Sequence, residues 1–322
     1  MSDGAVRFPT PGRTERRELA FDSAVLAGYS WPYFAISGAE DGPTLCLLAG
    51  VHGAEYPPID ALIRFCRELD PATLRGRVVA LPVLNLPAFR ARTPFLCPLD
   101  GKNPNRVFPG NAGGSFSEAL AHHIFEALIR PADALVDLHC GDLVEDLAPF
   151  SLVQECGDRE VDRRAMALAA AYGLPYLAVQ EPSDAALGGT TNGAAAAIGI
   201  PAAIVEAGGV GQLQPEAVAL HLRGLRGAMQ HLEMLPGRRT QLPEPELLRR
   251  FSWVRAAQGG FFRRAVSAGD RVEEGTVLGE MIDLWGDPVG QSTSPVAGVV
   301  LFVTTSPAIG DDGLIAGIGA VA

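Results

Sequence analysis

The sequence predicts an α/β protein in which a mainly parallel mixed sheet is flanked by helices, followed by a small all-β domain. Short apolar runs that suit buried strands, such as residues 44–49 and 134–138, alternate with segments of helical spacing, such as 58–66 and 159–172. Strands alternating with helices of this length indicate βαβ units and a parallel sheet. After residue 251, short runs are separated by turn signals and no helical period remains, which is typical of a small all-β domain.

Changes in composition predict the boundaries of these parts. We expect an α/β domain over residues 1–235, a linker over 236–250 and the all-β domain over 251–322. The linker is predicted from the sequence PGRRTQLPEPE, which is rich in proline and charged residues. Residues up to about Arg17 resemble a loose arm, because they are rich in Gly, Pro and Arg. Broken apolar runs from Leu19 to Ile36 favour antiparallel strands at the edge of the sheet.

Composition restricts the classes of function. A chain of 322 residues with 48% hydrophobic and 20% charged residues is typical of a soluble globular protein. The formal net charge of −11 argues against a nucleic-acid surface and against attraction to anionic lipid. The start lacks the apolar core of a secretory signal, and no run is long and apolar enough to span a membrane. The five scattered cysteines form no C-x-x-C pair. We therefore expect a cytoplasmic protein without a disulfide framework or a thiolate zinc site.

The first candidate site follows the apolar run 44–49. His52 lies between Gly50 and Gly53, and Glu55 follows Gly53. Both residues are on the turn that connects this predicted strand to the predicted helix. Open α/β sheets bind ligands at the carboxyl ends of their strands. A neutral imidazole and a carboxylate are both ligands of Zn²⁺, and a catalytic zinc takes about three protein groups plus water. The alternative is structural, with His52 capping the turn and Glu55 acting as an acid at the start of the helix.

Three further motifs occupy loop edges of the same predicted sheet. His139 ends a strand, so it can approach His52 and Glu55 in a parallel sheet; the alternative is a histidine bonded to a loop carbonyl. Glu206 ends another strand and could accept a proton from a metal-bound water, or be an ordinary acid of a loop. Asn105-Arg106 lies on a long loop rich in Pro and Gly, where the guanidinium offers a fork for a carboxylate or simply faces solvent.

Together these motifs resemble the succinylglutamate desuccinylase/aspartoacylase family, a branch of the zinc-carboxypeptidase-like fold. The resemblance covers roughly residues 44–235 and depends on four motifs in the family's order: His52-Gly-Ala-Glu55, Asn105-Arg106, Asp137-Leu-His139 and Glu206-Ala-Gly-Gly.

The resemblance implies one Zn²⁺ per chain and a set of roles. The metal would be held by His52, Glu55 and His139, while Glu206 would act as general base and then as proton donor. The family's substrate-carboxylate pair would match Asn105 and Arg106. Asp137 would bond the second nitrogen of a metal-bound histidine, or equally cap a neighbouring loop.

One element of the family pattern does not align. The family has an arginine shortly before Asn-Arg that polarises the scissile carbonyl. In this sequence, the positions at the corresponding distance before Asn105 are Cys97 and Pro98. With a longer loop, Arg92 is the best candidate for this oxyanion role and Lys102 the second.

The C-terminal segment resembles a biotinyl/lipoyl-type barrel through its turns Gly269-Asp270 and Glu274-Gly275 and its SPVAGVV segment. Carrier barrels are modified on a turn lysine. The only lysine of the chain is Lys102, so composition excludes a carrier function.

The function implied is metal-assisted amide hydrolysis of an N-acyl amino acid or a related small amide. Arg106 would hold the substrate carboxylate, and the oxyanion would rest on zinc and Arg92. One alternative is a zinc carboxypeptidase that acts on short peptides, with Arg106 gripping the terminal carboxylate. A second is a non-catalytic ligand-binding or assembly protein that retains the fold. The expected partner is the small-molecule substrate, and a homo-oligomer is left open.

Overall fold

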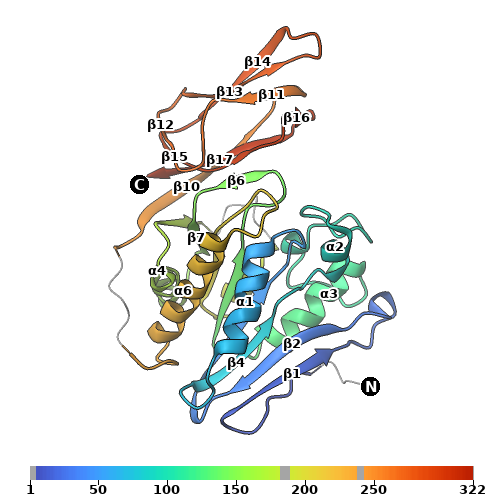
Figure 1. Cartoon of the computed structure of the whole chain (residues 1–322), viewed down its shortest axis with the longest axis vertical. Helices are drawn as coiled ribbons and strands as arrows, with labels where there is room; N and C mark the ends of the chain where they lie inside the picture. Colours follow the sequence, from blue (N-terminus) through green and yellow to red (C-terminus); the bar gives the residue numbers. More distant parts are fainter. Residues whose placement is uncertain (1–4, 182–188, 238–242, 322) are drawn as a thin grey trace.

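A single sheet runs through the whole protein and carries helices on both faces of its larger part (Figure 1). The computed structural model describes residues 5–181, 189–237 and 243–321. Within these residues, thirteen strands follow the order β1-β2-β4-β3-β5-β9-β7-β8-β10-β17-β15-β12, with β6 paired to β15. The strands of the α/β part are β1 Arg13–Leu19, β2 Trp31–Ser37, β3 Glu40–Ala49, β4 Arg75–Leu81, β5 Ala134–His139, β6 Glu145–Leu147, β7 Phe150–Gln154, β8 Tyr176–Gln180 and β9 Ala202–Glu206.

The sheet is mixed. Neighbours β4, β3, β5 and β9 are parallel, and so are β7 with β8. The pairs β1 with β2, β2 with β4 and β7 with β9 are antiparallel. The α/β class and the mixed sheet predicted from the sequence are confirmed. The loose arm predicted up to Arg17 is wrong, because β1 begins at Arg13 and pairs with β2 along its whole length.

Helices cover both faces of this part of the sheet. The main helices are α1 Tyr56–Glu68, α2 Leu86–Ala91, α3 Phe116–Ile124, α4 Arg159–Tyr172, α5 Thr191–Ala196 and α6 Pro215–His231, and the short helical turns are η1 Ala24–Leu26, η2 Pro104–Arg106 and η3 Phe125–Ile129. One apolar cluster joins α1, α4 and α6 to Leu45 and Leu47 of β3, while a second joins α3, η3 and α5 to Cys46 and Leu48. Alternate residues of β3 therefore face opposite layers, which explains why the strand reads as a continuous apolar run.

The C-terminal part extends the same sheet and adds a second one. Its strands are β10 Glu246–Arg255, β11 Gly260–Arg264, β12 Arg271–Val272, β13 Val277–Ile282, β14 Pro288–Thr293, β15 Gly298–Thr304, β16 Ala308–Ile309 and β17 Leu314–Val321. The second sheet has the order β14-β13-β11-β16, and an apolar core that includes Phe262, Leu278 and Val300 fills the C-terminal part. An all-β C-terminal part is thus confirmed, while the barrel type stays a prediction.

Strand β10 joins the two parts. Its first three residues pair in parallel with β8, and from Leu248 onward the strand pairs antiparallel with β17. Residues 246–250 of the predicted linker therefore belong to a strand, and residues 238–242 lie outside the described residues. The division into domains at 235 and 251 stays a prediction. Within the described ranges, every helix is too short or too polar to cross a membrane.

Candidate metal centre and active-site cavity

The first two candidate ligands lie on the tight turn between β3 and α1. A Cβ at Gly53 would lie 2.1 Å from the backbone nitrogen of Phe89, so only glycine lets this turn press against α2. Helix α1 then starts at Tyr56, with prolines in its first turn, where no intrahelical N–H donor is needed. His52 and Glu55 are thereby fixed at the carboxyl end of β3.

The third candidate ligand, His139, ends the neighbouring strand β5, and its side chain meets the other two. The Nδ1 of His52 lies 2.7 Å from Oε1 of Glu55, and the Nδ1 of His139 lies 3.0 Å from Oε2 of the same carboxylate. The two imidazole rings are 5.0 Å apart between centroids. The structure therefore brings together the three residues predicted as ligands, one atom from each lying within 4.8 Å of the others.

The second nitrogen of each imidazole faces an oxygen. The Nε2 of His139 lies 3.0 Å from Oδ2 of Asp137, and the Nε2 of His52 lies 3.0 Å from Oδ1 of Asn103. That Asn103 atom also accepts the backbone N–H of Asn105 at 2.8 Å, which identifies it as the amide oxygen. Because both partners are acceptors, each Nε2 can donate a proton to its partner, and each Nδ1, on the side of Glu55, is the nitrogen that would bind a metal.

This set of donors fits Zn²⁺. Two imidazole nitrogens and one carboxylate are a frequent protein contribution to a catalytic zinc site, which leaves a further position for water or substrate. Burial opposes ionisation of Glu55, but the adjacent imidazoles of His139 and His52 lower its pKa to about 2. Glu55 is therefore a carboxylate at neutral pH, as a metal ligand must be.

Glu206 lies beside this centre. It ends β9 directly opposite His139 in the parallel register, and it lines the same cavity. Its Oε2 is buried and has no hydrogen-bond partner among the described residues. Burial raises the pKa of Glu206 to about 8; His139 opposes this increase, while the charges of Glu55 and Glu145 add to it. An orphaned buried carboxyl at a cavity wall is typical of a group that exchanges a proton with a ligand.

Asn105 and Arg106 also line the cavity, from the short turn η2. The amide oxygen of Asn105 accepts the backbone N–H of Thr191 at 2.9 Å, and this bond ties the long loop to the start of α5. The guanidinium of Arg106 donates to the carbonyl of Asn105 at 2.7 Å, and burial lowers its pKa. Among the described acidic side chains, none forms an ion pair with Arg106, so its charge is available to an anion.

The two candidates for the oxyanion role lie elsewhere. Arg92 is exposed at the end of α2 in a left-handed conformation, outside the lining of the cavity. Lys102 pairs with Glu118 at 2.8 Å and is also absent from the lining. This placement gives no support to the role predicted for either residue.

The cavity has a volume of about 530 Å³ and includes residues that the sequence analysis missed. Gln180, which is 2% exposed, ends β8, and neither atom of its amide has a partner within the described chain. The other missed residues come from loops, from strands β6, β7 and β9, and from the C-terminal strands: Phe95, Asn103, Cys140, Glu145, Leu147, Phe150, Leu152, Thr190, Ile204, Phe251, Trp253, Arg255, Phe302 and Leu314. Asn103 precedes the predicted pair Asn105-Arg106 by only two residues, so its chemistry could have been noticed, whereas the aromatic residues carry no local signal.

Comparison with known proteins gives relatives of one kind. The chain is 34% identical over 251 residues to the N-alpha-acetyl-L-2,4-diaminobutyric acid deacetylase of Halomonas elongata, which covers 76% of this chain and 72% of that protein. Its fold matches the product-bound ectoine utilization protein EutE (DoeB) of Ruegeria pomeroyi with a TM-score of 0.87 and 26% identity, covering 98% of this chain and 97% of the other. It also matches a succinylglutamate desuccinylase/aspartoacylase of Rhodobacter sphaeroides with a TM-score of 0.86 and 26% identity, covering 99% of both chains.

A family model describes the part of the chain that carries the site. The model of the succinylglutamate desuccinylase/aspartoacylase catalytic domain matches residues 41–232, which include all seven residues predicted to form the metal and substrate site. With this match, and with relatives that are named as deacylases, the chain belongs to the succinylglutamate desuccinylase/aspartoacylase family.

Proposed function

We propose that this protein is a zinc-dependent amidohydrolase, with one Zn²⁺ per chain, that removes the acyl group from an N-acyl amino acid or a related small amide. The observation that carries the proposal is the meeting of His52, Glu55 and His139 beside the unpartnered carboxyl of Glu206. The names of the relatives support the same class of reaction, since one is a deacetylase of an N-acetylated amino acid.

Different residues of the chain would carry out the separate steps of hydrolysis. Zn²⁺ bound to His52, Glu55 and His139 would lower the pKa of water to near 7 and polarise a carbonyl. Arg106 would hold the substrate's carboxylate, and so fix the scissile amide near Glu206. Glu206 would take a proton from the attacking water and return it to the leaving amine. The oxyanion role predicted for Arg92 is not part of this proposal, because that side chain lies outside the cavity.

Replacement of Glu206 tests the assignment of the base. Glu206→Gln keeps the size of the side chain but cannot accept a proton. We expect wild-type zinc content and a loss of kcat of roughly 10²- to 10⁴-fold on an N-acetyl amino acid. As the matched variant, His52→Ala should lose zinc as well as activity. A Glu206→Gln protein with the wild-type rate would remove Glu206 from the base role, and full zinc occupancy in His52→Ala would remove His52 from the ligand set.

A carboxypeptidase acting on short peptides is the second candidate function. Arg106 would then grip the terminal carboxylate, with the same zinc and the same base. Parallel assays of N-acetyl amino acids and dipeptides separate the two, because the group removed is a simple acyl group in the first and an aminoacyl group with a free amine in the second. Faster hydrolysis of dipeptides would replace the deacylase assignment.

We also infer a cytoplasmic location. All five cysteines are free, and four of them are buried. Free buried thiols are common in a reducing compartment, where disulfides rarely persist.

A further inference from the structure

The cavity wall away from the metal is aromatic and comes largely from the C-terminal part. Residues Phe251 and Trp253 of β10 and Phe302 of β15 line it. Their rings form one cluster, with centroids 4.8 Å apart for Phe251 and Trp253, 5.5 Å for Trp253 and Phe302, and 6.1 Å for Phe251 and Phe302. Phe150 of β7 adjoins this cluster, 6.5 Å from Phe251. We call Phe150, Phe251, Trp253 and Phe302 the aromatic wall.

The backbone beneath the aromatic wall is shaped to seat these rings. Phe251 and Trp253 are two residues apart on one strand, so they face the same side of the sheet. A Cβ at Gly317 of β17 would lie 2.2 Å from Phe302 and 2.6 Å from Phe251. Glycine at this position therefore leaves the space that the two rings occupy, and a larger residue would push them toward the cavity.

The aromatic wall is open toward the cavity rather than closed by other protein groups. Phe251 and Trp253 are only partly buried, and the Nε1 of Trp253 is buried without a hydrogen-bond acceptor among the described residues. Indole N–H groups in protein interiors normally have a partner. An apolar group cannot supply that acceptor, so the surface that a ligand can cover is the partly exposed ring faces of Phe251 and Trp253 rather than the indole N–H.

The charges around the aromatic wall bear on which ligand group fits it. Aromatic faces attract an ammonium group as well as an apolar ring. However, Arg255 follows on the same face of β10 and also lines the cavity, so a cation there would meet a positive charge. The nearest acid to Arg255 is Asp312, whose carboxylate is 3.7 Å away and largely exposed. Glu145 of β6, the strand paired with that of Phe302, also lines the cavity, so the charges favour neither sign, and the apolar ring faces themselves suit an uncharged apolar group.

We propose that the substrate carries a ring-sized apolar group that packs on Phe251, Trp253 and Phe302 while its carboxylate is held by Arg106. This inference rests on the proposed deacylase function and narrows it to N-acyl amino acids that bear an aromatic ring. The ring can belong to the amino acid, as in N-acetyl-L-phenylalanine, or to the acyl group, as in N-benzoylglycine. The volume of about 530 Å³ admits either arrangement together with the reacting amide.

A comparison of substrates on the zinc-loaded protein tests the inference. The measured quantity is kcat/KM for N-acetyl-L-phenylalanine, N-benzoylglycine, N-acetyl-L-alanine, N-acetyl-L-aspartate and Nα-acetyl-L-2,4-diaminobutyrate. We expect at least one ring-bearing compound to exceed the alanine compound by roughly tenfold or more, because burial of an apolar group discriminates by this order. Which of the two ring compounds is faster identifies the side of the amide that faces the aromatic wall.

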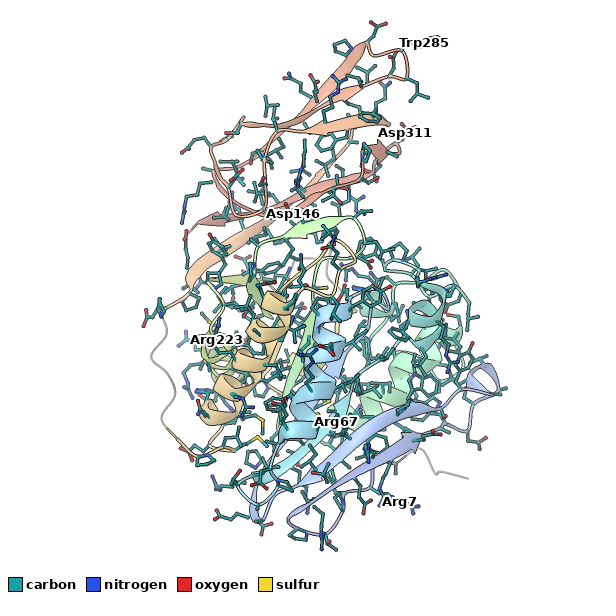
Figure 2. The ribbon with its side chains drawn as sticks, in the orientation of Figure 1. Arg7, Arg67, Asp146, Arg223, Trp285 and Asp311 are labelled. Atoms are coloured by element: carbon teal, nitrogen blue, oxygen red, sulfur yellow. The ribbon has the colours of Figure 1, made fainter. Side chains whose placement is uncertain are left out.

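Two variants assign the preference to the aromatic wall. Trp253→Ala should reduce the ratio of ring-bearing to alanine kcat/KM to near unity. Trp285→Ala is the matched control, because Trp285 is 92% exposed at the outer end of the C-terminal part, far from the cavity (Figure 2). It should keep the wild-type ratio. Where Trp253→Ala fails to fold, as judged by its thermal transition, the comparison of substrates on the wild-type protein decides alone.

The outcomes distinguish a failure of this inference from a failure of the proposed deacylase function. Hydrolysis of the alanine compound without a preference for a ring overturns the inference and leaves the deacylase function standing. Preference for the diaminobutyrate compound also overturns it, and would assign the aromatic wall to an ammonium group. If none of the five compounds is hydrolysed, both the proposed function and this inference fail.

Discussion

Asp137 offers the sharpest test of the metal centre, because its effect can be measured without a substrate. Its side chain is fully buried, and Oδ2 lies 3.0 Å from Nε2 of His139 and accepts the hydroxyl of Thr191 at 2.5 Å. The sequence left open whether Asp137 orients a ligand or caps a loop, and the geometry assigns both contacts to one oxygen. Asp137→Asn keeps the shape but removes the charge that holds the imidazole.

The expected loss follows from the position of Asp137 behind a ligand. Replacing the partner of a metal-bound histidine typically weakens metal binding by about 10- to 100-fold. That corresponds to about 1.4 to 2.8 kcal/mol of binding free energy. We expect the upper half of this range, because Asp137 is fully buried on the far side of His139, where no water can replace its carboxylate.

A competition titration with a chromophoric zinc chelator measures the Kd directly. Thr191→Val is the matched variant, since it removes only the hydroxyl donor to Asp137 and leaves the bond to His139. We expect it to weaken zinc binding by less than Asp137→Asn does. A wild-type zinc Kd for Asp137→Asn would show that the carboxylate does not orient His139 for a metal, and the reasoning from the Nε2 partners would fail.

Two other predictions concern the different roles of Arg106 and Arg92, and the effect of metal removal on stability. Arg106→Ala should raise KM by roughly 10- to 100-fold, as loss of a charged hydrogen bond predicts, whereas Arg92→Ala should change kcat/KM by less than about twofold, like other surface substitutions. A strong effect at Arg92 would restore its oxyanion role. Removing zinc with a chelator should lower the thermal transition by several degrees, because a metal held at 1,000 times its Kd stabilises the folded state by about 4 kcal/mol. An unchanged transition would contradict a metal site within the folded core.

The α/β part could be predicted because its signals are local. Each face of β3 meets a helical layer, so Leu45 and Cys46 are both buried and the strand reads as an unbroken apolar run. His139 and Glu206 end their strands and His52 lies three residues after β3, and the register of a parallel sheet then brings them to one edge.

What the sequence could not indicate depends on pairing between distant segments. The edge strand β1 has the sequence RTERREL, in which charged residues occupy both faces, and only its ladder with β2 makes it a strand. The start of β10 at Glu246 depends on its partner β8. Similarly, Trp253 and Phe302 line the cavity only because β10 and β15 are joined through β17, and no spacing within either segment predicts this.

The continuity of the sheet bears on how the protein discriminates between substrates. Strands β9, β7, β8 and β10 are neighbours, so backbone hydrogen bonds connect Glu206 to the aromatic wall without a break. Leu248 pairs with Ala178 three positions before Phe251, and this register fixes the distance between the wall and the metal end of the cavity. If the site closed by movement of the C-terminal part, this ladder of backbone hydrogen bonds would have to break. The binding of one small substrate would then have to offset the free energy of the lost hydrogen bonds. We therefore expect selection among N-acyl amino acids to arise from the fit to a preformed cavity, so that substitutions in the wall change the ratio of kcat/KM between substrates.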